Sequence, residues 1–144
     1  MPDSLIQAWH RYVSATPLIR QHVREWLLFV TSNAERADQS DIVARTTDVL
    51  TELRDLQRRV EAVQRVVPID GDLSTILRLR LTTVDAYLAV GIHELERFLS
   101  AETGTPHAAW LVELETAIVD SLAAHRALVA GDIDRVPRDH RLGE

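Results

Sequence analysis

The chain has 144 residues, no cysteine, and a formal net charge of −6 from 16 basic and 22 acidic residues. This length suits a single domain that buries its own core. The absence of cysteine excludes disulfides, thiolate nucleophiles and cysteine-ligated zinc or iron–sulfur sites. The N-terminus lacks signal-peptide features, and no apolar run approaches the ~20 residues that span a bilayer. We therefore expect a cytoplasmic protein that does not bind membranes.

Proline marks an expected boundary in the first part of the chain. A first helix is expected over 3–15. Thr16 and Pro17 have the residue types of an N-cap followed by proline at the first helical position. A second helix is therefore expected over 17–36. Its apolar stripe is so wide that this helix should be the most enclosed of all.

The next helix, expected over 40–67, has the most regular pattern of the chain. Its apolar positions follow one another at alternating steps of four and three, which is the heptad spacing of a helix packed along one seam. The seam consists of Ile42, Thr46, Val49, Leu53, Leu56, Val60, Val63 and Val67. We predict that the centre of this seam is buried.

Two further helices complete the expected fold. One is expected over 73–102 and the other over 106–130, where Gly131 ends it. Residues 132–144 are rich in charges and are expected to form a flexible tail, which leaves 1–131 as one helical domain. The predicted fold class is all-α. It is either a five-helix globin-like domain or a helical bundle with two or three long helices.

The helix over 73–102 carries apolar residues on a second face, which would leave surface to cover. The residues of this face are Ile76, Tyr87, Val90 and Gly91. Two-fold contact with another copy of the chain would cover it, and the glycine would allow close approach. We expect such a homodimer. The alternative is that the first helix folds back and covers the face with Trp9 and Tyr12.

Without cysteine, catalysis or metal binding would depend on histidines and carboxylates. His22 and Glu25, and likewise His93 and Glu96, have the three-residue spacing that puts both side chains on one helical face. Di-iron bundles use the opposite order, Glu-x-x-His, which the chain lacks. We expect no metal and no other cofactor. A metal-binding bundle that uses these four residues is an alternative.

His125 stands in the apolar seam of the last helix. A histidine in that place is usually a hydrogen-bonded core group, and the alternative is a pH-sensing or ligand-contacting role. The chain contains no nucleophile motif and no glycine-rich phosphate loop, so we predict no catalytic residue and no enzyme. Its negative charge, with acids beside the arginines, disfavours nucleic acid as a partner.

The segment from Val66 to Leu73, followed by 76–80, resembles the turn and following helix of the N-terminal sensor domains of stressosome co-antagonist proteins. These domains are non-haem relatives of globins. Trp9 and the segment 110–125 stand at compatible places, so the resemblance extends over about residues 3–130. It implies a sensory or regulatory module that dimerises through its last two helices.

Together these observations predict a non-enzymatic regulatory domain that forms a homodimer and contacts another protein. Two alternatives remain open. One is the metal-binding bundle, and the other is a helical bundle that binds a small ligand.

Overall fold

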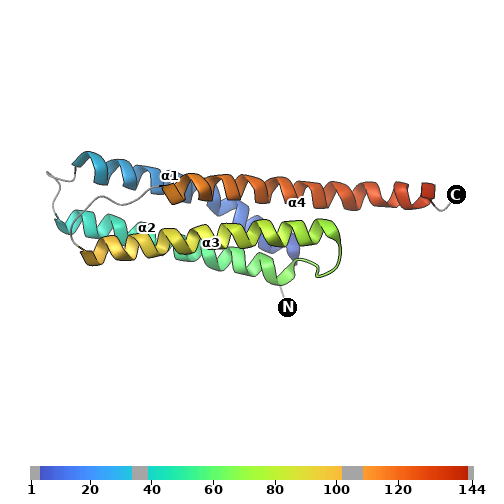
Figure 1. The fold of residues 1–144 in the computed structure, drawn as a ribbon, viewed down its shortest axis with the longest axis horizontal. Coiled ribbons are helices and arrows are strands. Elements are labelled where there is room, and N and C mark those ends of the chain that lie inside the picture. The colour runs from blue at the N-terminus through green and yellow to red at the C-terminus, as the bar shows by residue number, and fades with distance from the viewer. Residues whose placement is uncertain (1–3, 34–38, 102–108, 143–144) are drawn as a thin grey trace.

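The computed structural model describes residues 4–33, 39–101 and 109–142. Within these ranges all regular secondary structure is α-helical, and residues 67–71 form the turn between two of the helices. The helices are α1 (Leu5–Asn33), α2 (Gln39–Val66), α3 (Asp72–Ala101) and α4 (Ala109–Leu142). They run alternately in opposite directions and each packs beside the next (Figure 1). Side chains of α1 and α4 also meet, so the arrangement is an up-down-up-down four-helix bundle.

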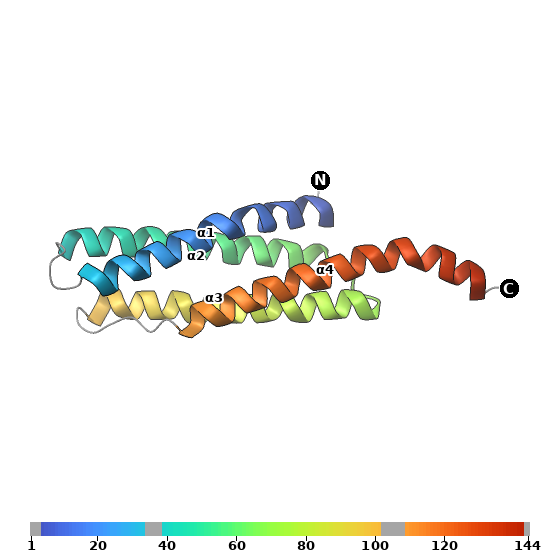
Figure 2. The same ribbon diagram turned by 90° about the horizontal axis from the view of Figure 1, so that it is seen from above.

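The expected count of five helices is not confirmed, because α1 continues through Pro17 (Figure 2). Proline has no N–H to donate to the carbonyl of Val13, four residues earlier. The hydroxyl of Thr16 donates to that carbonyl instead, at 2.9 Å. Two residues before Val13, the carbonyl of Arg11 also accepts from Nη1 of Arg59 in α2, at 2.8 Å, which ties this part of α1 to its neighbour. The Thr16 hydroxyl satisfies the carbonyl that the proline leaves without a backbone donor, and the helix continues.

The second half of α1 is also less enclosed than its apolar composition predicts. Ile19, Val23 and Trp26 are buried, but the side chain of Leu28 is 67% exposed. In a four-helix bundle each helix contacts two neighbours, so its outward side remains in solvent. The width of an apolar stripe is therefore no guarantee that it is covered.

The last helix extends beyond its expected end. Gly131 does not stop α4, which runs on to Leu142, and its final turns project past the other helices (Figure 1). Gly131 instead lies against the side chain of Leu73 in α3. The expected boundary at residue 131 is thus a point of close approach between two helices, and the part of the expected tail up to Leu142 is helical.

The core confirms the seam of α2. Every seam position from Ile42 to Val67 is buried, and Leu53, Leu56 and Val60 have no exposed surface. The seams of the neighbouring helices face them with side chains that are equally enclosed. These are Leu77, Leu81, Val84, Leu88 and Leu95 of α3 and Leu114 and Ile118 of α4. One continuous apolar core therefore joins the helices.

Two buried polar contacts fix the position of α1 against its neighbours. Nε1 of Trp26 donates to Oγ1 of Thr46 in α2 at 2.8 Å. The hydroxyls of Tyr12 and Ser121 in α4 form a hydrogen bond of 2.8 Å. Thr46 and Ser121 each also donate to a carbonyl of their own helix. Because an unmet buried polar group is costly, these contacts favour one register of α1 over its alternatives.

We expect Leu56→Ala to lower the free energy of unfolding by about 2–5 kcal/mol, because the side chain is fully buried and its removal leaves a cavity. Urea denaturation followed by circular dichroism measures the change. A loss below about half a kcal/mol, far short of the usual cost of a core truncation, would show that the α2 seam is not the core.

Gly91→Ala should destabilise the protein, although this change usually stabilises a helix interior by roughly 0.5–1 kcal/mol. A Cβ at Gly91 would stand 2.6 Å from Cζ3 of Trp110, so the indole must shift, at an expected cost of about 1–3 kcal/mol. The control is the same change beside Trp110→Leu, where the obstacle is gone and the sign should reverse. Equal or greater stability of Gly91→Ala alone would contradict the contact.

Candidate functional site

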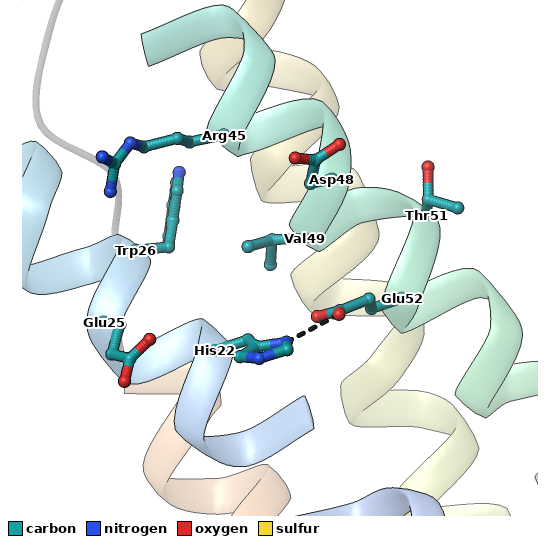
Figure 3. Close-up of a pocket in the computed structure, with 8 residues that line it drawn as sticks. All are labelled: His22, Glu25, Trp26, Arg45, Asp48, Val49, Thr51 and Glu52. Atoms are coloured by element: carbon teal, nitrogen blue, oxygen red, sulfur yellow. Dashed lines mark hydrogen bonds and ion pairs between the residues drawn. The ribbon is translucent and has the colours of Figure 1, made fainter. Parts of the chain in front are cut away.

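The most distinctive polar site of the described residues is a groove between α1 and α2. It has a volume of about 490 Å³ and is open to solvent. Three side chains of α1 and five of α2 line it (Figure 3). They are His22, Glu25, Trp26, Arg45, Asp48, Val49, Thr51 and Glu52. The groove therefore combines an imidazole, three carboxylates, a guanidinium and an aromatic wall.

The centre of the groove is a contact between an imidazole and a carboxylate. Nδ1 of His22 lies 2.6 Å from Oε1 of Glu52, across the two helices (Figure 3). The other oxygen of Glu52, Oε2, is buried and has no hydrogen-bond partner among the described residues. Both side chains are about one-third exposed, so solvent and solutes reach the pair.

The remaining polar groups of the groove are held on its rim. The guanidinium of Arg45 lies 4.0 Å from the centre of the Phe29 ring, which is a cation–π contact. Glu25 accepts a hydrogen bond from Gln21, one turn earlier on α1. Trp26 is anchored by Thr46, so the wall it forms is rigid. The groove thus has a fixed back wall and charged groups at its mouth.

The contact of His22 with Glu52 matches part of a catalytic triad. A carboxylate that orients a histidine through Nδ1 supplies two of the three members of a triad, and the third, a nucleophile, must stand near the other ring nitrogen. The only hydroxyl among the lining side chains is that of Thr51, and it donates to the carbonyl of Thr47. The described lining therefore holds a polar pair without an activated nucleophile.

The two expected His–Glu pairs do not come together as one metal site. His22 contacts Glu52, while Glu25 contacts Gln21. On α3, His93 is exposed and Glu96 accepts from Arg54 of α2. Across the described ranges, no three His, Asp or Glu side chains stand close enough to hold a metal ion. The alternative site of His22, Glu25, His93 and Glu96 is thus not assembled in this structure.

His125 contacts an aromatic ring. It stacks on Trp9 of α1 with ring centres 3.9 Å apart and planes 8° apart. Trp9 in turn packs on Tyr12, whose hydroxyl reaches Ser121. Burial lowers the pKa of His125 below its ordinary value of 6.5, because the charged imidazolium loses hydration. Burial also raises the pKa of Tyr12 to about 12.

The expected interface residues of α3 divide into two groups. Ile76 and Val90 are exposed and Tyr87 is half-buried. Gly91 is instead buried beneath Trp110 of α4, so the close approach that it allows occurs within the chain. Trp9 and Tyr12 contact α4 and leave Ile76 and Val90 exposed, so the alternative in which the first helix covers this face is wrong.

Sequence reasoning missed Glu52 and Arg45. Both are separated from their partners on α1 by the connection between the helices, and spacing within one helix cannot reveal such a contact. It also missed Glu115 of α4, which is nearly buried and receives the guanidinium groups of Arg20 and Arg24. An acidic residue among the apolar positions of α4 was the available signal for that contact.

Comparison with known proteins adds no assignment. No known protein family, curated protein or solved structure matches the chain. In the part of the chain that the structure describes, none of the helices is both long and apolar enough to cross a membrane.

Stability should fall as the pH drops from about 6.5 toward the lowered pKa of folded His125. The unfolded chain binds a proton at His125 in this interval while the folded chain does not, so protonation favours unfolding. Above this interval the imidazole is neutral in both states and the effect vanishes. Urea midpoints at pH 7.5 and 5.5 measure the loss.

The variant His125→Phe keeps a ring against Trp9 and cannot titrate, so it should lose less stability between these two pH values than the wild type. His10→Gln is the matched control, because His10 is exposed on α1. It should retain the wild-type pH dependence. Equal losses in all three proteins would contradict the assignment to His125.

Proposed function

We propose that the chain is a non-enzymatic regulatory domain that acts through protein–protein contact and dimerises through α3 and α4. The observation that carries the proposal is an apolar outward face on these two helices. It consists of Ile76, Leu79 and Val90 of α3 and Val112 and Val119 of α4, all of them exposed. Exposed apolar side chains that share one side of a helix are typical of interaction sites.

The spacing of these residues supports a helical partner. Ile76, Leu79, Thr83, Ala86 and Val90 follow one another at alternating steps of three and four, and all are exposed. This is the spacing of a seam that packs against another helix. The outer face of α4 carries small residues, Thr116, Ala123, Ala127 and Ala130, beside its two valines. Small side chains would let a second subunit approach closely.

The outer side of α2 has a different character. The exposed side of α2 carries mainly charged and threonine side chains, and the groove of His22 and Glu52 opens there. A regulatory domain needs an input as well as a contact surface, and this groove favours a small polar ligand as that input. The resemblance of residues 66–80 to stressosome sensor domains supports the same class of function. Cytoplasmic location and a further protein partner remain part of the proposal.

Sedimentation equilibrium at micromolar concentration tests the dimer. The chain mass is 16.2 kDa, and we expect the wild type to sediment at about twice this value. Leu79→Glu places a charge on the proposed face and should return the mass to that of one chain, with helicity retained by circular dichroism.

Leu28→Glu is the matched control. Leu28 and Leu79 are exposed to 67% and 61%, but Leu28 lies on α1, away from the proposed face. This variant should remain dimeric. A wild type that sediments at 16.2 kDa at all concentrations would overturn the dimer, as would equal dissociation by both glutamate variants.

A further inference from the structure

We propose that, in the dimer, α3 of each copy packs against α4 of the partner, about a two-fold axis that runs along the bundle. The occupant of the apolar face is thus a second copy in one orientation. This inference rests on the proposed dimerisation and adds its geometry. It follows from which residues of α3 and α4 lie at the same height along the bundle, and from the charged side chains on the outer sides of these two helices.

Two close approaches establish which residues of α3 and α4 lie at the same level. Gly91 abuts Trp110, and Leu73 abuts Gly131. Because the two helices are antiparallel, a step back along α3 corresponds to a step forward along α4. Thr83 is eight residues before Gly91, so it lies level with residue 118, eight residues after Trp110. Counted from the contact of Leu73 with Gly131, Thr83 is ten residues after Leu73 and lies level with residue 121, ten residues before Gly131. The middle of the α3 stripe is therefore level with residues 118–121 of α4.

The two stripes have similar lengths and nearly the same centre. From Ile76 to Val90 the α3 stripe extends for about 21 Å, at 1.5 Å per residue. The α4 stripe from Val112 to Ala130 extends for about 27 Å on the same scale and is centred at residue 121. A two-fold operation maps such a face onto itself. Two orientations of the axis in the plane of the face satisfy this requirement: along the helices, or across them.

Charge distinguishes these two orientations. Arg80 lies one turn after Ile76, and Asp120 lies one turn after Thr116; both are exposed. Asp120 stands near the centre of the face. An axis across the helices would stack α4 on α4 and bring Asp120 onto its own copy. An axis along the helices places α3 over α4, and Arg80 then stands within about three residues of the level of the partner's Asp120, so unlike charges meet. Like charges that face each other at an interface oppose association, so the axis along the helices is favoured.

The preferred orientation has a consequence for the ends of the molecule. The final turns of α4 project beyond the bundle (Figure 1). With the axis along the helices, both projections leave the dimer at the same end. With the axis across the helices, they would leave at opposite ends. The inferred dimer therefore presents a pair of helical extensions on one side, where a single partner could contact both.

Disulfide trapping tests the geometry, and the absence of native cysteine makes it free of background. Ile76 and Ala127 are exposed and lie at the same level, since each is three or four residues from the Leu73–Gly131 approach. Chains with Ile76→Cys and chains with Ala127→Cys are mixed in denaturant, refolded together and oxidised. Non-reducing electrophoresis then measures the cross-linked dimer.

We expect the mixture to cross-link at least about fivefold more than either variant alone, because a disulfide requires Cα atoms about 4.4–6.8 Å apart. Thr83→Cys reports the other orientation, since an axis across the helices would bring the middle of α3 onto its own copy. Strong cross-linking of Thr83→Cys alone, or no excess in the mixture, would overturn the inference. If sedimentation shows a dimer in that case, the proposed function stands and only the geometry fails.

Discussion

The continuity of α1 through Pro17 is the constraint on which the rest of the structure depends. A break at this residue would give a short mobile helix that could fold over any neighbouring face. The Thr16 hydroxyl compensates for the missing N–H, and the continuous helix is then tied to α2 by Trp26 and Thr46 and to α4 by Tyr12 and Ser121. A helix held on those two neighbours cannot also cover the outer side of α3. The exposed apolar face is a direct consequence.

Features that depend on neighbouring residues in the sequence could be predicted, and features that depend on contacts between distant residues could not. The buried seam of α2 was predictable because a heptad pattern depends only on spacing within one helix. The break expected between residue 15 and Pro17 is absent, because contacts with distant residues hold α1 on both sides of the proline: Tyr12 with Ser121, and Trp26 with Thr46. The same limit applies to the candidate groove. His22 was recognised as a polar group on a helical face, but its partner Glu52 became evident only when α1 and α2 were placed together.

The groove and the proposed dimer face lie on different pairs of helices. On the α1–α2 side, charged groups surround an open groove whose central carboxylate has one oxygen without a partner among the described residues. On the α3–α4 side, exposed valines, leucine and isoleucine are spaced as a helical seam. The up-down topology produces this separation, because consecutive helices are neighbours and the pairs α1–α2 and α3–α4 form opposite sides. A polar solute and a second subunit would thus meet different helices.

Any mechanical connection between these sides must pass through α1 or through the α2–α3 core. The path through α1 is the more specific one. His22 lines the groove, and on the same helix Arg20 and Arg24 hold Glu115 of α4. Farther toward the N-terminus, Trp9 stacks on His125 of α4.

Because α4 also contributes to the apolar face and carries the projecting turns, a shift of α1 along its axis would strain the contacts that position α4. Packed helices change between discrete arrangements and do not deform continuously, so such a shift would favour one arrangement of α4 over another. The polar contacts of α1 are thus the part of the fold at which a groove ligand and the state of the dimer would influence each other.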